Sequence, residues 1–415
     1  MKKLILLSAL FPFTFLLSTA FAQTAYITNS GSNTVSVINV ATNTVTDTIE
    51  VGSGPCGISV SPDGSKVYVT NWGANTVSVI NTATNTVSAT ITGFVNPLGV
   101  SVSPDGSKVY VTNANTPGTV SVISSATNTV SATITVDSGP YGISVSPDGS
   151  KVYIANCNAT GTVSVISSVT NTVSATITVD SGPYGVSVSP DGSNVYVTNE
   201  NSNTVSVINT ATNTVSATIT VGSFPLGISI SPDGSKVYVA NDSDNTVSII
   251  NSSTNTVSAT VTVGAYPVGV SVSPDGNKVY IANYGSNTVS VINTATNTVS
   301  ATIAVGFGPF AFGNFIWTYG DGIAPQSMLP AGIEVYPNPT SGKFKVTSPK
   351  AQIQSLEVYN IIGEKVYTTT NYKPLTTCLP ARQANEIDIS SFPAGMYVVE
   401  VKTEKGVEVR KFVKE

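Results

Sequence analysis

The 415-residue chain contains no histidine, and only 10% of its residues are charged. Without histidine, the chain cannot form a Ser-His-Asp triad, a His-ligated zinc or copper site, or a His-ligated haem. Apolar residues make up 41% of the chain, but beyond residue 22 they alternate with small polar residues. This alternation is typical of strands, so we expect no transmembrane segment in the mature chain.

The N-terminus has the parts of a secretory signal peptide. Lys2 and Lys3 precede an apolar run over residues 4–17, and the small residues Ala20 and Ala22 precede Gln23. We predict a signal peptide over residues 1–22. A membrane anchor is the alternative, which the shortness of the apolar run disfavours.

Cysteine and basic residues are also scarce. The chain has three cysteines, Cys56, Cys157 and Cys378, so at least one of them is unpaired. We expect no disulfide between Cys56 and Cys157, because they fall in loops of different repeats. Residues 23–320 carry five lysines against thirteen acidic residues, a net charge of −8. An acidic region lacks the basic footprint of a nucleic-acid binder, so no nucleic-acid partner is expected.

A repeat of 42 or 43 residues runs through the first three quarters of the chain. Each copy contains a tyrosine followed by an apolar residue, a small residue and asparagine; these tyrosines are Tyr26, Tyr68, Tyr110, Tyr153, Tyr196, Tyr238 and Tyr280. Each copy also has four short alternating runs, separated by turn residues such as Ser-Pro-Asp-Gly. Seven copies of four strands predict an all-β fold, a seven-bladed β-propeller over residues 23–317.

The order of strands predicts how the ring closes. The mature chain begins with the second strand of a repeat, and residues 306–316 resemble the start of a first strand but lack the Ser-Pro-Asp-Gly turn. We therefore expect the first blade to combine three N-terminal strands with one C-terminal strand.

Beyond the repeats, residues 318–333 are rich in glycine and proline and are interpreted as a linker. Residues 334–415 alternate Lys and Glu with Val, Ile and Tyr, which predicts a small immunoglobulin-like β-sandwich.

Two family resemblances follow from these motifs. The repeats resemble the bacterial surface-layer β-propellers with a Tyr-Val-Thr-Asn signature, which is intact at residues 68–71, 110–113 and 196–199. The C-terminal region resembles the sorting domain of the type IX secretion system of Bacteroidetes. The residues that match its pattern include Pro337, Asn338, Pro339, Gly342, Gly363, Lys365, Pro393, Gly395 and Tyr397.

The second resemblance implies a partner and a destination. It implies recognition by the type IX secretion machinery and a protein that is secreted or attached to the cell surface. An accessory sandwich without a sorting role is the alternative, because a fold alone does not fix function.

The repeats differ mainly in the loops that open on one side of the predicted disc, between the second and third strands and between successive repeats. We call this side the variable face. Its candidate ligand-binding residues are Trp72, Asp137, Tyr141, Asn158, Asp180, Tyr184, Glu200, Asp242, Asp244 and Tyr284. Aromatic rings beside carboxylates and amides suit a sugar. Alternatively, the tyrosines only cap the blade ends. Asp242 and Asp244 supply too few oxygen ligands for calcium, so neither a metal nor a cofactor is expected.

The sequence thus predicts an exported, non-enzymatic propeller that binds a surface polysaccharide, glycan or protein. The alternative is a propeller enzyme of the lactonase-like or quinoprotein-like kind, for which the nearly identical repeats offer no convergent catalytic residues.

Overall fold

The computed structural model describes residues 23–158, 160–318, 334–336, 343–348, 353–360, 365–369, 383–393, 395–403 and 406–414. The predicted signal peptide and residues 319–333 of the predicted linker lie outside this description. Among the described residues, no helix is long and apolar enough to cross a membrane.

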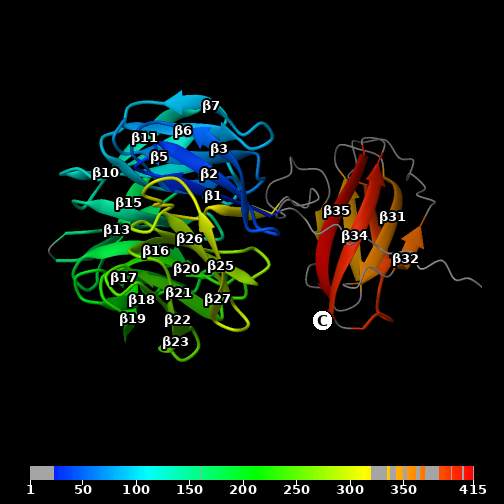
Figure 1. The fold of residues 1–415 in the computed structure, drawn as a ribbon. Coiled ribbons are helices and arrows are strands. Elements are labelled where there is room, and N and C mark those ends of the chain that lie inside the picture. Colours follow the sequence, from blue (N-terminus) through cyan, green and yellow to red (C-terminus); the bar gives the residue numbers. More distant parts are fainter. Residues whose placement is uncertain are drawn as a thin grey trace, which may run out of the picture.

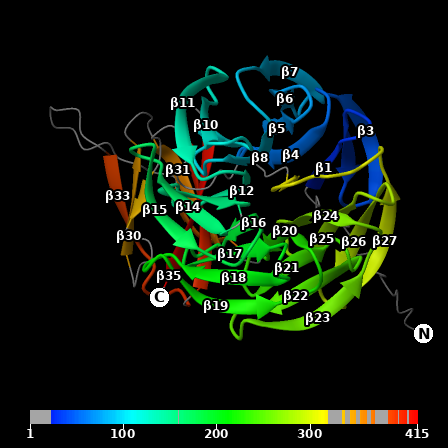
Figure 2. The same cartoon turned by 90° about the vertical axis from the view of Figure 1, so that its left-hand side faces the viewer.

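Strands β1 to β28 form seven antiparallel four-stranded sheets, arranged in a ring as the blades of a propeller (Figures 1 and 2). Blade 1 contains β28 (Ile316–Thr318), β1 (Gln23–Asn29), β2 (Thr34–Asn39) and β3 (Thr44–Glu50). Blade 2 contains β4 (Pro55–Val60), β5 (Lys66–Asn71), β6 (Thr76–Asn81) and β7 (Thr86–Ile91). Blade 3 contains β8 (Pro97–Val102), β9 (Lys108–Asn113), β10 (Gly118–Ser124) and β11 (Thr129–Val136). The predicted fold is confirmed.

The remaining four blades repeat the same order. Blade 4 contains β12 (Pro140–Val145), β13 (Lys151–Asn156), β14 (Thr162–Ser167) and β15 (Thr172–Thr178). Blade 5 contains β16 (Pro183–Val188), β17 (Asn194–Asn199), β18 (Thr204–Asn209) and β19 (Thr214–Thr220). Blade 6 contains β20 (Pro225–Ile230), β21 (Lys236–Asn241), β22 (Thr246–Asn251) and β23 (Thr256–Thr262). Blade 7 contains β24 (Pro267–Val272), β25 (Lys278–Asn283), β26 (Thr288–Asn293) and β27 (Thr298–Ala304).

The core lies between blades, where the repeated Tyr-Val-Thr-Asn segment faces its neighbours. The tyrosine rings are buried among valines and isoleucines; Tyr68 and Tyr238 are fully buried. The threonine hydroxyl reaches across to the next blade, as when Thr70 Oγ1 donates to the Leu98 carbonyl at 2.6 Å. The asparagine binds within its own blade, where Asn71 Nδ2 donates to Ser78 Oγ at 2.9 Å. Each position of the signature therefore has its own structural role.

The ring closes as predicted, with three N-terminal strands and one C-terminal strand. β28 pairs with β1 in an antiparallel register that joins Ala25 to Ile316. The position of the strand within residues 306–316 differs from the expectation, because β28 begins only at the end of that segment. Pro309 makes a separate bridge with Asn29. Phe310 and Phe315 still hydrogen-bond to β1, and residues 312–314 between them form a crossing segment that leaves the blade toward the centre of the ring.

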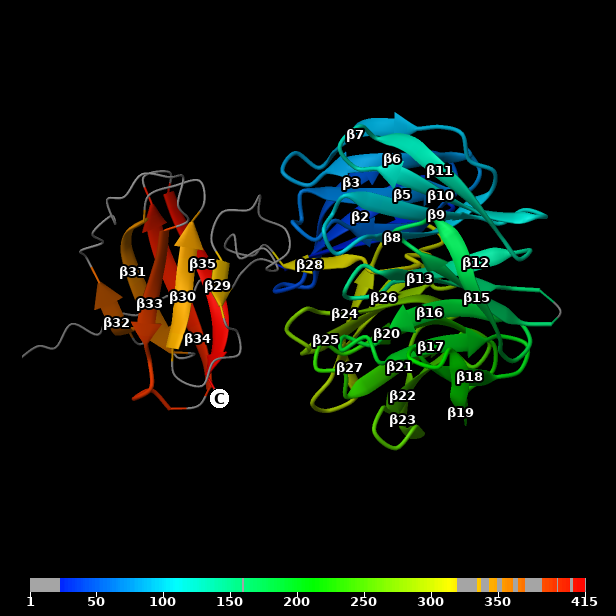
Figure 3. The same ribbon diagram turned by 180° about the vertical axis from the view of Figure 1, so that it is seen from behind.

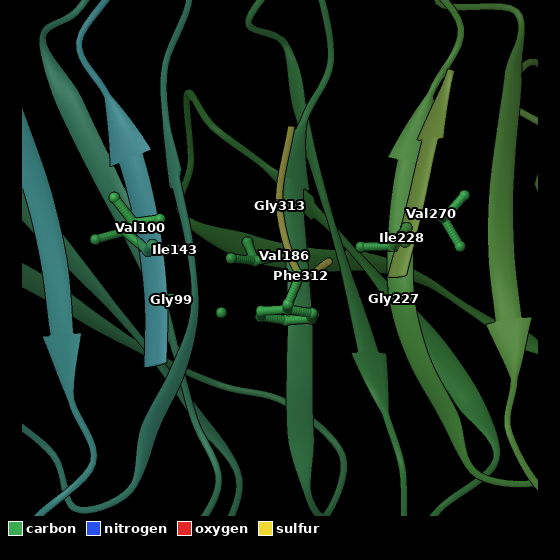
Figure 4. A pocket seen from close by; sticks show the side chains of 11 residues that line it. Gly99, Val100, Ile143, Val186, Gly227, Ile228, Val270, Phe312 and Gly313 are labelled. Atoms are coloured by element: carbon green, nitrogen blue, oxygen red, sulfur yellow. The ribbon is translucent and has the colours of Figure 1, made fainter. Parts of the chain in front are cut away.

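This crossing segment lines the pocket at the axis of the ring. Phe312 forms a parallel bridge with Gly57 of β4, and the Phe312 carbonyl accepts the Ile58 N–H at 3.0 Å. In Figure 4 the Phe312 side chain and Gly313 lie among residues of the innermost strands, including Val186 and Ile228. A Cβ on Gly313 would lie 2.4 Å from the Ile58 carbonyl oxygen, so only glycine fits there.

Strands β29 to β35 form a second unit with its own core. One sheet has the order β29 (Glu334–Tyr336), β30 (Lys343–Ser348), β33 (Gln383–Asp388); the other has the order β32 (Lys365–Thr369), β31 (Ile353–Asn360), β34 (Gly395–Thr403), β35 (Gly406–Lys414). Figure 1 presents the second sheet and Figure 3 the first, on opposite sides of the unit. Phe344, Leu356 and Val399 belong to the core of this unit.

Part of the predicted sorting motif falls within the described residues. Lys365 lies in β32, where its Nζ contacts Glu357 Oε1 at 2.6 Å. Tyr397 of β34 is buried, and its hydroxyl donates to the Pro393 carbonyl at 2.8 Å. Gly395 begins β34. The other predicted motif residues, Pro337, Asn338, Pro339, Gly342 and Gly363, lie outside the described part of the chain.

Candidate functional site

Seven equivalent loop pairs form the variable face. In each pair, the loop between blades lies against the loop between the second and third strands of the following blade. An equivalent backbone hydrogen bond of 2.7 to 3.0 Å is present in every pair. The bonds run from the N–H groups of Ser30, Trp72, Ala114, Cys157, Glu200, Asp242 and Tyr284 to the carbonyls of Gly308, Gly54, Asn96, Gly139, Gly182, Phe224 and Tyr266, respectively.

The seven residues that provide these carbonyls all precede a proline and all have positive φ. Four are glycines and one is asparagine, but Phe224 has φ 57° and Tyr266 has φ 51°. A bulky residue in this conformation brings its Cβ close to the following carbonyl, at a cost of about 1–2 kcal/mol. The chain therefore places two aromatic residues where its other repeats use residues suited to the conformation.

These two side chains are exposed, together with two aromatic neighbours. The exposed fractions are 40% for Phe224, 54% for Tyr266, 45% for Tyr284 and 65% for Phe307. Tyr266 leans over Gly285, where an added Cβ would lie 2.3 Å from Tyr266 Cδ2. These four residues, which we call the aromatic arc, lie in consecutive loop pairs from blade 5 to blade 1.

Two carboxylates lie next to the aromatic arc. Glu200 and Asp242 occupy equivalent positions in blades 5 and 6 and are half-buried. Burial raises the pKa of Glu200, and Asp242 adds to the rise; burial also raises the pKa of Asp242. Cys157 donates from Sγ to Glu200 Oε1 at 3.4 Å, and burial with the nearby Glu200 raises the pKa of the Cys157 thiol to about 12. The thiol is thus protonated at neutral pH and is a poor nucleophile.

Tyr141 and Tyr184 lie on strands, not on loops as the sequence analysis assumed. They follow the first proline of β12 and β16, where a register irregularity turns this position toward the axis. The Tyr184 ring meets the Tyr141 ring at a centroid distance of 4.9 Å and the Phe312 ring at 5.2 Å, both edge to face. With Leu98, Leu226 and Val268, they form an apolar cluster at the axis.

Half-buried Trp72 packs against the edge of this cluster. Phe310 joins the cluster to the aromatic arc, because its ring lies 6.5 Å from Tyr284 and 6.4 Å from Phe312. The structure therefore brings together six of the ten predicted residues, namely Trp72, Tyr141, Tyr184, Glu200, Asp242 and Tyr284.

The side chains of the other four predicted residues accept hydrogen bonds from neighbouring loop or strand residues. Thr162 donates to Asp137 Oδ2 at 2.6 Å, and Thr204 donates to Asp180 Oδ2 at 2.7 Å. Asp244 Oδ2 accepts the Ser223 N–H at 2.7 Å, and Asn158 Oδ1 accepts from Thr160 at 3.0 Å. One side-chain oxygen of each residue is therefore engaged within the protein. Cys56 and Cys157 are both free, but Cys56 lies at the start of β4 and not in a loop.

The candidate ligand-binding residues predicted from the sequence did not include Phe224 and Tyr266, and the role of Phe312 was not predicted. A comparison of the residues that precede the repeated proline would have found the first two, since glycine is the usual residue there. Phe312 has no counterpart in the other repeats, so repeat comparison gives no signal for it.

The structure defines the protein class: a seven-bladed β-propeller followed by a small β-sandwich. Residues 334–415 match the family described as the secretion system C-terminal sorting domain, so the chain carries that domain. Residues 3–118 and 228–315 match the YNCE-like beta-propeller family, and residues 150–258 match the family described as Lactonase, 7-bladed beta-propeller. Both predicted resemblances are confirmed. The sorting domain indicates type IX secretion to the cell surface or beyond.

Solved structures are similar to the propeller. Hydrazine synthase of Kuenenia stuttgartiensis is 25% identical, with a TM-score of 0.62 over 66% of this chain and 92% of that one. A functionally unknown protein from Desulfotomaculum acetoxidans is 21% identical, with a TM-score of 0.62 over 71% of this chain and 98% of that one, and shows the fold alone. No curated protein matches the chain.

Proposed function

We propose that this exported propeller is a non-enzymatic binding scaffold whose variable face captures a glycan at the cell surface. The observation that carries the proposal is the pair Phe224 and Tyr266, exposed aromatic residues with a positive φ. Glycine in four equivalent loops removes the strain. Exposed rings retained at such a cost are more readily explained by contact with a ligand than by folding.

The composition of the face matches the chemistry of a sugar. A pyranose ring has an apolar face that stacks on an aromatic ring, and its hydroxyls need hydrogen-bond acceptors. The aromatic arc supplies the rings, and the half-buried Glu200 and Asp242 supply acceptors beside them. The apolar cluster at the axis, which includes Tyr141, Tyr184 and Phe312, lies between the loops of this face.

The axial channel favours binding over catalysis. A catalytic propeller would need an acid and base pair, or metal ligands, converging in the channel. The described channel residues are glycines, aliphatic residues and Phe312, including Val100, Ile143 and Val270. A lactonase-like or quinoprotein-like activity remains the alternative function, and a substrate screen on the same protein tests it.

The test is a double variant, Phe224→Gly with Tyr266→Gly, probed on an array of bacterial surface glycans. Because glycine is the residue used at this position in four other blades, the variant should fold and melt at or above the wild-type temperature. Glycan capture should be lost. Capture that survives both substitutions would exclude Phe224 and Tyr266 as binding residues and overturn the proposal.

A matched control separates binding from stability. Asn96 occupies the equivalent position between blades 2 and 3, outside the aromatic arc. Asn96→Gly makes the same backbone change there and should leave glycan capture unchanged. If the double variant instead melts well below wild type, the rings act as blade-end caps.

A further inference from the structure

The face opposite the variable face departs from the repeat pattern in two of the seven blades, blade 1 and blade 5. On this face a lysine at the start of the second strand spans the gap to the next blade. Its ammonium group donates to a backbone carbonyl in the last turn of that blade, at 2.6 to 3.0 Å. The five bonds are Lys66 to Ser125, Lys108 to Ser168, Lys151 to Thr210, Lys236 to Thr294 and Lys278 to Val40.

Blade 1 has Thr24 at this position and lacks the Ser-Pro-Asp-Gly turn, whereas blade 5 has Asn194 and keeps that turn. The Asn194 side chain does not span the gap; its Nδ2 donates to the adjacent Ser193 Oγ at 2.9 Å. The carbonyl equivalent to the other five acceptors belongs to Ser252 of blade 6, which lines the same groove. This groove has a volume of about 400 Å³, against about 240 Å³ for each of three described grooves that contain the lysine.

The groove between blades 5 and 6 is also more acidic than its neighbours. Asp191 and Asp233 line it, as two such carboxylates line the groove between blades 4 and 5, but without the lysine they have no cation between them. Hydrogen bonds from Ser231 and Ser235 lower the pKa of Asp233 to about 2, so this carboxylate is ionised at neutral pH. The groove carries about one more negative charge than the groove that holds Lys151.

A further acceptor lies in the same turn. Asn255 Oδ1 is buried and has no hydrogen-bond partner among the described residues. At the junction of blades 7 and 1, the equivalent Asn43 Oδ1 lies 3.1 Å from Lys278 Nζ. At this junction Lys278 reaches both the backbone carbonyl and the asparagine oxygen, whereas beside the other four lysines the equivalent oxygens of Asn128, Asn171, Asn213 and Asn297 also have no partner among the described residues.

We propose that the groove between blades 5 and 6 binds an external lysine side chain, presented by a partner protein, whose ammonium group takes the place of the missing internal lysine. The five filled grooves give the chemistry of the occupant: a primary ammonium on an unbranched alkyl chain. The site lies on the opposite face from the proposed glycan site and does not depend on it.

The experiment uses the full mature chain and two small probes, n-butylammonium chloride and Nα-acetyl-lysine amide. Tetramethylammonium chloride at equal ionic strength controls for screening, because it has no N–H donor. Backbone amide shifts near Gly234 and Ser252 and the melting temperature report binding. Wild type should show saturable shifts and a melting temperature that rises with either probe but not with tetramethylammonium.

Two variants test how many probe molecules bind to each chain. Asn194→Lys should fill the groove internally, raise the melting temperature and abolish probe binding. Lys151→Asn should open a second groove between blades 4 and 5, so that two probe molecules bind per chain instead of one.

Three outcomes would overturn the proposal. The first is the absence of saturable binding to wild type up to about 100 mM probe, because a site with a millimolar dissociation constant would then stabilise the protein measurably. The second is unchanged probe binding by Asn194→Lys. The third is a single binding site in Lys151→Asn. Binding of n-butylammonium without binding of the acetylated lysine would overturn the assignment to a protein side chain, because the groove would then exclude a backbone-linked amine.

Discussion

The role of the crossing segment can be tested by Phe312→Ala. The ring is 6% exposed, meets Tyr184 edge to face at a centroid distance of 5.2 Å, and lies 6.4 Å from Phe310. Truncating a buried phenylalanine typically costs about 3–5 kcal/mol of unfolding free energy, and an aromatic pair of this kind contributes about 0.5–1.5 kcal/mol beyond area. We expect a loss of about 3–5 kcal/mol.

The control is Phe307→Ala, just before the crossing segment. Phe307 is 65% exposed, and exposed substitutions usually change the unfolding free energy by no more than about 0.5 kcal/mol. The two variants remove the same atoms from positions five residues apart, so their difference reports burial in the channel and not the loss of a ring as such.

The assay is guanidinium unfolding followed by tryptophan fluorescence and by far-UV circular dichroism. Trp72, one of the two tryptophans of the chain, packs against the apolar cluster at the axis and contributes a signal from it. Coincident transitions by both probes justify a two-state free energy. If both variants have an unfolding free energy within about 0.5 kcal/mol of wild type, Phe312 does not stabilise the propeller by packing at the axis.

Four further predictions follow from the fold and the site. Tyr238→Ala removes a fully buried ring between blades and should cost about 3–5 kcal/mol in the same unfolding assay; a change below about 1 kcal/mol would contradict the placement of the core. Truncation after Val305 removes β28 and the crossing segment and exposes the edge of β1, so it should cause aggregation that light scattering detects. A truncated monomer with an unchanged melting temperature would argue against closure of the ring by β28. Deletion of residues 335–415 should leave a folded propeller in the periplasm of the native host, and equal surface display with and without the deletion would count against a sorting role. Glu200→Gln should raise the melting temperature at pH 7. Burial raises the pKa of Glu200 above the ordinary value of 4.5, so wild type loses stability as the pH rises from 4.5 through the raised pKa of the folded protein. The higher melting temperature of Glu200→Gln should therefore disappear below pH 4.5. A higher melting temperature that persists below pH 4.5 would exclude ionisation of Glu200 as its cause.

The repeat made most of the fold predictable. A period of 42 or 43 residues sets one blade, alternation sets its four strands, and the missing first strand at the N-terminus predicts closure by the C-terminal segment. Each of these inferences uses a pattern that is present several times, so the copies check one another.

The parts of the site that could not be predicted depend on local geometry. Tyr141 follows Pro140 at a register irregularity, which turns its ring to the axis instead of leaving it on a loop. The crossing of Phe312 depends on extra residues between Pro309 and β28, which have no copy elsewhere in the chain. Periodicity assigns residues to strands, but it does not say on which side an irregular residue points.

The repeats offer a general argument about which residues serve function. Glycine before the proline is compatible with the backbone in four blades, and a lysine joins five pairs of blades. The chain thus already contains the residue that relieves strain at Tyr266 and the residue that would join blades 5 and 6 at Asn194. Folding alone favours those residues at these positions. Departures that cost stability, although the favourable residue is present in neighbouring copies, point to a requirement other than folding, and they are found on both faces of the disc.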